Sequence, residues 1–191
     1  MSAAPDLIAV PDLRSARLGD VESMAAMINR FAAQGLMLPK STTELSRSFR
    51  EYLVLTGPDG VAACAGLRVY SPDLAEIVGL AVDEGWQGRG LGSRLVAQLV
   101  EEAKRLSIKR LFAMALKDGF FHPHGFRTVP REWLPEKIAA DCRGCSRRSG
   151  CNEIAVLLDL DPGAAPLGAP RSRARRKGEL KVIPRATRRR G

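Results

Sequence analysis

The pattern of apolar and polar positions predicts two helices in the first part of the chain. Apolar residues recur at three- and four-residue spacing between Asp20, which can cap a helix, and Gly35, which can end one. Residues 41–44 read Ser-Thr-Thr-Glu, a capping-box pattern, and predict a second, short helix through Phe49. Both helices come before the first long apolar run.

Continuous apolar runs after this point predict strands, with helices between some of them. The turn at residues 57–60, Gly-Pro-Asp-Gly, predicts that the first two strands form a hairpin. The expected strands are residues 52–56, 61–70, 76–82, 110–116 and 153–160, and further helices are expected at residues 91–106 and 118–124. The predicted order is therefore α, α, β, β, β, α, β, α, β.

A glycine-rich loop, Gln-Gly-Arg-Gly-Leu-Gly at residues 87–92, joins the third expected strand to the helix after it. Glycine lets a backbone approach a ligand closely, and the first amides of a helix have no partner within it. Together with the helix dipole, those amides favour an anion such as a pyrophosphate. A P-loop is disfavoured, because no Lys-Ser or Lys-Thr follows the second glycine. A dinucleotide-binding loop is also disfavoured, because the glycine spacing differs and no later acid is present at the required distance.

The charge is concentrated at the end of the chain. The 191 residues suit one domain with appendages and carry a net charge of +9. Residues 161–191 hold ten Lys or Arg against two acids, a net of +8, so the rest carries +1. This tail is expected to be disordered, and it could contact nucleic acid or be a solubilising extension without aromatic residues for stacking.

Several absences set the expected compartment. No apolar run reaches the roughly eighteen residues of a spanning helix, and the start of the chain lacks a signal-peptide pattern. Four cysteines without a secretion signal suit a reducing compartment. We therefore expect a cytoplasmic protein with no membrane partner.

The glycine loop resembles motif A of the GNAT acetyltransferases. Three residues fill the defining positions of that motif: Gln87, Gly90 and Gly92. The resemblance implies an α/β (α+β) GNAT fold, a mixed and mostly antiparallel sheet flanked by helices, with acetyl-CoA as co-substrate between two splayed strands. Those strands would be residues 76–82 and 110–116, where Gly79 could allow a bulge or mark tight packing under a helix. The expected domains are a flexible N-terminus at 1–14, a GNAT N-acetyltransferase domain at 15–160 and a disordered Arg-rich tail at 161–191.

A longer resemblance, from about residue 17 to residue 158, is to the acetyltransferase domain of N-acetylglutamate synthases. It rests on separate stretches at residues 34–38, 62–67, 76–82, 109–113, 120–121 with 125–126, and 134–137. It implies transfer of an acetyl group from acetyl-CoA to the α-amine of L-glutamate in a ternary complex, the first committed step of arginine synthesis. Many such synthases also carry an amino-acid-kinase domain, so this chain would be a stand-alone short form.

The resemblance implies roles for individual residues. Glu76 is the candidate base that deprotonates the amine, and its alternative is a strand-end residue facing solvent. A backbone amide near Leu80 or Ala81 would stabilise the oxyanion. Lys40 would bind a substrate carboxylate beside backbone groups of Leu38, or would be a solvated loop lysine. The expected cofactor contacts are Leu80, Ala81, Val82, Gln87, Gly88, Arg89, Gly90, Leu91, Gly92 and Phe121.

The departing thiolate has fewer candidates. Many family members place a tyrosine acid where this chain has Phe121, and a hydroxyl residue often found near Ala115 is missing too. Cys64 could donate a proton or be a small core residue. We expect the thiolate to leave unaided or through water.

Other features leave alternatives open. Cys142, Cys145 and Cys151 have metal-ligand spacing, with His122 or His124 as a further ligand, but free thiols are the alternative and no metal is predicted. A second carboxylate-binding cation is expected among Arg143, Arg147 and Arg148. The chain could instead acetylate another amine, such as an amino-acid analogue or a protein N-terminus, or bind acyl-CoA without catalysis. The expected partner is L-glutamate, with nucleic acid only through the tail and a homodimer left open.

Overall fold

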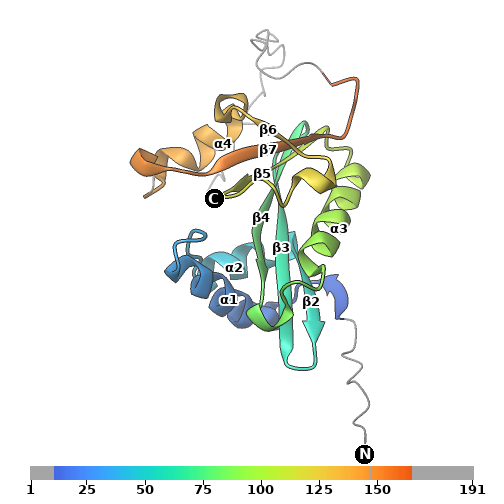
Figure 1. Ribbon diagram of the computed structural model, residues 1–191, viewed down its shortest axis with the longest axis vertical. Coiled ribbons are helices and arrows are strands. Elements are labelled where there is room, and N and C mark those ends of the chain that lie inside the picture. The colour runs from blue at the N-terminus through green and yellow to red at the C-terminus, as the bar shows by residue number, and fades with distance from the viewer. Residues whose placement is uncertain (1–10, 147, 165–191) are drawn as a thin grey trace, which may run out of the picture.

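The computed structural model describes residues 11–146 and 148–164, and within them it holds a seven-stranded sheet with helices on both faces (Figure 1). The strand order is β1-β2-β3-β4-β5-β7-β6, and all neighbouring strands are antiparallel except β4 and β5. The strands are β1 Asp12–Ser15, β2 Tyr52–Gly57, β3 Gly60–Ser71, β4 Leu74–Val82, β5 Arg110–Ala115, β6 Arg127–Val129 and β7 Ile154–Asp159. The helices are α1 Val21–Ala33, α2 Thr42–Ser48, α3 Leu91–Arg105 and α4 Pro135–Ala140. The expected mixed, mostly antiparallel sheet flanked by helices is confirmed.

Each face of the sheet buries a different helix, because successive side chains of a strand point to opposite faces. In β2, Leu53 and Leu55 belong to the core under α3, whereas Tyr52 and Val54 belong to the core under α1 and α2. Figure 1 shows α3 on one side of the sheet and α1 with α2 on the other. A third cluster holds α4 against β5 and β7 through the fully buried Leu134.

Local sequence signals explain how α1 and α2 begin. Ser41 Oγ accepts a hydrogen bond from Glu44 N at 3.1 Å, and Glu44 Oε2 accepts one from Ser41 N at 2.8 Å, so the predicted capping box of α2 is confirmed. Asp20 is the N-cap residue of α1, as predicted, but its side chain makes no capping hydrogen bond to the helix. Its carboxylate instead accepts from Arg17 N at 2.6 Å and pairs with the guanidinium of Arg14 at 2.7 Å.

The sheet divides between β4 and β5. These two strands pair only where residues 74–77 face residues 110–113; beyond that, β4 continues beside β3 and β5 continues beside β7. Gly79 lies at the division with φ +60°, and the β3–β4 register shifts by one residue there. The expected splay and bulge are therefore confirmed, and the close neighbour of Gly79 is the Tyr52 hydroxyl rather than a helix.

The remaining predictions match less closely. The edge strands β1 and β6 and the short helix α4 were not predicted, and residues 12–14, expected within the flexible N-terminus, lie in β1. The helix expected at residues 118–124 is wrong except for a 3-10 turn at His122–His124. The expectations for residues 1–10 and for the tail beyond residue 164 lie outside the described residues. No helix in the described part of the chain is long and apolar enough to cross a bilayer.

Candidate active site

A cavity of about 570 Å³ lies where β4 leaves β5, against the start of α3. Gly90 is the N-cap of α3 with φ +77°, a conformation that glycine adopts without strain. The first backbone hydrogen bond of the helix runs from Arg94 N to Gly90 O, so the amides of residues 91–93 have no acceptor within it. The cavity is lined by Phe31, Leu36, Met37, Leu80, Ala81, Val82, Trp86, Gln87, Gly88, Gly90, Leu91, Gly92, Ser93 and Phe120.

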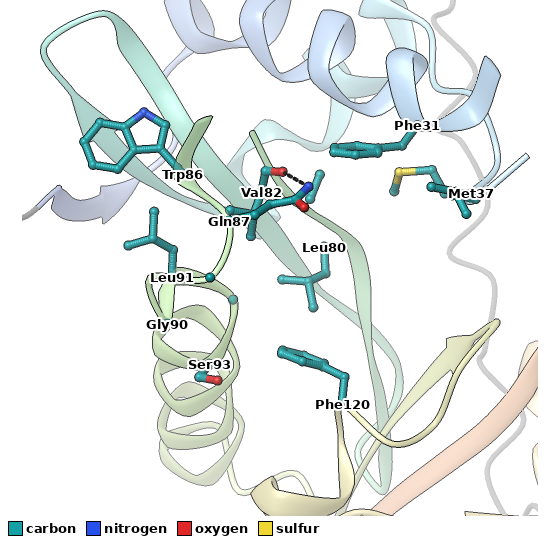
Figure 2. A pocket seen from close by; sticks show the side chains of 14 residues that line it. Phe31, Met37, Leu80, Val82, Trp86, Gln87, Gly90, Leu91, Ser93 and Phe120 are labelled. Atoms are coloured by element: carbon teal, nitrogen blue, oxygen red, sulfur yellow. Dashed lines mark hydrogen bonds between the residues drawn. The ribbon is translucent and has the colours of Figure 1, made fainter. Parts of the chain in front are cut away.

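The glycine loop is tied to β4 by a side chain. Gln87 Nε2 donates to Val82 O at 3.2 Å, which Figure 2 shows at the rim of the cavity. Figure 2 also shows Leu80 and Phe120 pointing into the cavity opposite Gly90. This bond gives Gln87 a loop-positioning contact that needs no ligand.

Two residues expected at the cofactor lie elsewhere. Arg89 does not line the cavity; its guanidinium lies 5.0 Å from the centre of the Trp86 ring. Phe121 is buried against Phe126 and lines the neighbouring pocket, whereas Phe120 lines this larger cavity.

A second pocket, of about 390 Å³, adjoins the first and shares Leu36, Met37 and Leu80 with it. It brings together the three residues expected at the acceptor: Leu38 and Lys40 from the connector before α2, and Glu76 from β4. Its other walls include residues of α2, β3, β5 and α4. A ligand in the first cavity and a ligand in this pocket would therefore meet beside Leu80.

Glu76 is buried with one carboxylate oxygen held by protein groups. Only 3% of the residue is exposed, and its Oε2 accepts hydrogen bonds from Tyr70 Oη at 2.6 Å and from Lys137 Nζ at 2.9 Å. Oε1 has no hydrogen bond within the described residues and is not an enclosed polar atom, so it opens onto the pocket. Burial raises the pKa of Glu76, and the charge of Lys137 partly offsets that effect. The alternative of a solvent-facing strand-end residue does not fit this burial.

Lys137 and Asp141 complete the charge cluster around Glu76. Lys137 Nζ also bonds Asp141 Oδ2 at 2.8 Å, and Tyr70 Oη is hydrogen-bonded to the same oxygen. Burial alone would lower the pKa of Lys137, but the two carboxylates outweigh it and the pKa is raised. Burial pushes the pKa of Asp141 upward, and its bonds to Lys137 and Tyr70 bring it below the usual value. Arg68 adds a weaker ion pair to Asp141 at 3.9 Å.

Lys40 is the cation of this pocket that has no carboxylate partner among the described residues. Its backbone is fixed by Asn29, which bonds Lys40 O at 2.9 Å and Lys40 N at 3.0 Å. Burial and the nearby Arg68 lower the pKa of Lys40. The negative charge of an incoming carboxylate would offset both effects on the pKa of Lys40.

The positions considered for a proton donor to the thiolate do not supply one. Ala115 and Phe121 both line the acceptor pocket and offer no proton. Cys64 is fully buried with Sγ directed at Gly79 O, 3.6 Å away, and burial raises the pKa of its thiol to about 12. The structure therefore places Cys64 in the core.

The cysteine cluster and the second cation are not supported as site features. No group of three or more metal-ligating side chains gathers anywhere in residues 11–146 and 148–164. The Cys151 thiol lies 3.8 Å from Glu153 Oε2. Arg143 is exposed and lines neither pocket, while Arg147 and the side chain of Arg148 lie outside the described residues.

Among the polar residues of the acceptor pocket or its border that were not predicted, four lie around Glu76: Arg68, Tyr70, Lys137 and Asp141. Arg68 is opposite Glu76 in the β3–β4 register, and Tyr70 is two residues along on the same face. That alternation was a usable signal in the sequence. Lys137 lies on α4 and Asp141 directly follows it, one helical turn away, and no local pattern indicates the position of α4 against the sheet.

Comparison with known proteins gives consistent similarities. The profile of the acetyltransferase (GNAT) family matches residues 23–126. An uncharacterized N-acetyltransferase of Chlorobaculum tepidum is 31% identical over 148 residues, 78% of this chain and 96% of the relative. An amino-acid acetyltransferase of Mycobacterium tuberculosis is 32% identical over 153 residues, 78% of this chain and 85% of the relative. The structure of N-acetylglutamate synthase from Neisseria gonorrhoeae with coenzyme A and N-acetyl-glutamate superposes with a TM-score of 0.71 at 32% identity, covering 80% of this chain but only 35% of that one.

Proposed function

Because the chain belongs to the acetyltransferase (GNAT) family, we propose that it transfers the acetyl group of acetyl-CoA to the α-amine of L-glutamate. The observation that carries this proposal is the buried carboxylate of Glu76, which opens onto a pocket adjoining the cofactor cavity. The amino-acid acetyltransferase of M. tuberculosis and the N-acetylglutamate synthase structure support the choice of acceptor. The reaction would be the first step of arginine synthesis.

Acetyl-CoA would occupy the larger cavity. Its pyrophosphate would meet the free amides at the start of α3, where the helix dipole favours negative charge. Its pantetheine amides would pair with the part of β4 that β5 leaves unpaired, as an added strand. The thioester would then lie beside Leu80, which both cavities share.

The chemical step needs a neutral amine. The substrate ammonium would pass one proton to Glu76 Oε1, and the free amine would attack the thioester carbonyl. A backbone amide at Leu80 or Ala81, in the bulged stretch after Gly79, would stabilise the oxyanion. The attacking nitrogen would lose its second proton to water, and the thiolate would leave without a protein acid and take up one proton from water, since Ala115 and Phe121 supply none.

Acceptor binding would rest on Lys40. Its ammonium group lines the pocket without an ion-pair partner in the described part of the chain, so a substrate carboxylate would be bound there. Backbone groups of Leu38 lie on the same connector. The pocket also holds Arg68 and Lys137, but both already face carboxylates of the protein.

The direct test measures CoA release from acetyl-CoA across a panel of free amino acids. We expect turnover with L-glutamate, and Glu76→Gln should lower kcat by about 10²–10⁴ while acetyl-CoA still binds, as measured by calorimetry. Glu22→Gln, at an exposed glutamate in the first turn of α1, is the matched control and should retain the wild-type rate. Turnover with a different amine alone would refute glutamate as acceptor. Acetyl-CoA binding without any turnover would favour a non-catalytic acyl-CoA-binding protein.

A further inference from the structure

A buried base must lose the proton that it takes up in each turnover. Glu76 lines the acceptor pocket, which the substrates would fill during the reaction. The Glu76 side chain is 4% exposed, so bulk water has little direct access to it. The second oxygen, Oε2, faces the protein and is the other place from which a proton can leave.

A chain of hydrogen bonds runs from Oε2 toward the surface. Tyr70 Oη is 2.6 Å from Glu76 Oε2 and is also hydrogen-bonded to Asp141 Oδ2. Asp141 also borders the acceptor pocket, but its side chain is 34% exposed, far more than that of Glu76, so it meets water more readily. One hydroxyl group therefore joins an enclosed carboxylate at the pocket to a carboxylate that meets water.

We propose that Tyr70 and Asp141 form the route by which the proton taken from the acceptor amine leaves Glu76, an inference that rests on the proposed acetyl transfer. The ammonium group gives a proton to Glu76, and a half-turn of the carboxyl group presents it at the Oε2 position. Glu76 then donates this proton to Tyr70 Oη as the phenolic proton passes to Asp141 Oδ2. Asp141 releases a proton to water, so Glu76 is again a carboxylate, Tyr70 is again a phenol, and one proton has left.

The charges around this route favour a concerted transfer. Burial and the neighbouring carboxylates of Glu76 and Asp141 raise the pKa of Tyr70, so the phenol gives up its proton only as it receives another. The low pKa of Asp141 means that it does not retain the proton. The other titratable groups that face the route come from three elements. They are Arg68 and Tyr70 on β3, Lys137 on α4 with Asp141 at its C-terminal end, and Lys40 on the connector before α2. β5 places the apolar Phe112 opposite Glu76.

Tyr70→Phe tests the route with little change in shape. The ring keeps its contacts with Phe112 and Lys137, and only the hydroxyl group is lost. Asp141→Asn removes the terminal acceptor near the surface and does not depend on the stability of the first variant. Tyr52→Phe is the matched control, because the Tyr52 hydroxyl is buried and has no hydrogen-bond partner in the described residues.

The assay follows steady-state CoA release with the acceptor that the wild-type protein uses, with and without added imidazole. For Y70F and D141N we expect kcat to fall about tenfold or more, with the KM for acetyl-CoA within about twofold of wild type. Imidazole, a small base that can enter the pocket, should restore kcat of both variants in proportion to its concentration but leave wild type and Y52F unchanged. A purely structural role would not give this rescue.

Two results would overturn the proton route. One is a Y70F variant with a kcat within about twofold of wild type, and the other is a loss of kcat that imidazole does not restore in either variant. If Y70F does not fold, D141N alone decides between these outcomes. A wild-type protein without turnover on any amine would refute the proposed function, and the route with it. An active wild type whose variants keep its kcat would refute the route alone.

Discussion

Lys137→Met would test the charge balance around Glu76. Lys137 Nζ lies 2.9 Å from Glu76 Oε2 and 2.8 Å from Asp141 Oδ2, and the Lys137 and Glu76 side chains are 14% and 4% exposed. Methionine keeps an unbranched apolar side chain and removes the charge. The substitution therefore leaves a buried carboxylate with Tyr70 as its remaining hydrogen-bond donor.

The expected cost follows from this geometry. Two unit charges 2.9 Å apart attract by about 6 kcal/mol at an effective dielectric constant of about 20. Removing both charges from water offsets much of that attraction, but breaking a buried pair on one side costs about 3–5 kcal/mol. We expect the free energy of unfolding of K137M at pH 8 to be about 3–5 kcal/mol lower than that of wild type.

The loss should depend on pH with a definite sign. Burial raises the folded-state pKa of Glu76, so its contribution to stability is present below the unfolded pKa and is lost as pH rises through the folded pKa. Lys137 limits this rise, and its removal raises the folded pKa further. Between about pH 5 and pH 8 the stability of K137M should therefore fall more steeply with pH than that of wild type.

Urea unfolding at pH 5 and pH 8, followed by circular dichroism, measures both effects. Lys104→Met is the matched control, because Lys104 pairs with Glu101 at the surface and is 51% exposed; its cost should stay within about 0.5 kcal/mol. The double variant K137M/E76Q should recover much of the loss, since the unpaired charge is gone. A cost under about 1 kcal/mol at pH 8, or a double variant no more stable than K137M, would refute the reasoning.

Three further predictions concern the core near the splay. Tyr52→Phe removes a buried hydroxyl without a partner in the described residues, so thermal unfolding should show no loss and a gain of up to about 1 kcal/mol. Gly79→Ala places a Cβ 2.8 Å from the Tyr52 hydroxyl at φ +60°, so it should lower the free energy of unfolding by more than about 1 kcal/mol and weaken acetyl-CoA binding. The control Gly119→Ala has open space around it and should lower the free energy of unfolding by less than about 0.5 kcal/mol. Burial raises the pKa of Cys64 to about 12, so mass spectrometry after alkylation at pH 8 should find the half-buried Cys145 labelled and Cys64 labelled only after unfolding.

The parts of the fold that could be predicted from the sequence are those with strong local patterns. The capping box at Ser41 and the hairpin turn at residues 57–60 carry their own geometry, and the bulge at Gly79 follows from a glycine in an apolar strand. The edge strands β1 and β6 have four and three residues, too few for a period to show. Their place in the sheet comes from pairing with β2 and β7 rather than from propensity.

The site residues also divide into those that a local pattern indicates and those that depend on tertiary contacts. The glycine loop could be located because its backbone requirements are local: Gly90 must adopt a positive φ where α3 begins. Which of Phe120 and Phe121 lines the larger cavity could not be predicted, because the turn before His122 is not a regular helix whose face can be counted. Neighbouring residues there point into different cavities.

The state of Glu76 depends on contacts that no single segment of the sequence contains. Tyr70 reaches it across the β3–β4 pair, whereas Lys137 reaches it because Leu134 anchors α4 in a core shared with β5 and β7. A glutamate at the same position without Lys137 would be costly to ionise, and one without burial would be an ordinary surface carboxylate. The chemistry expected of this residue therefore rests on a helix of six residues some sixty positions away. Lys137 and Asp141, as much as the glycine loop, are the residues to examine when the activity of this protein is measured.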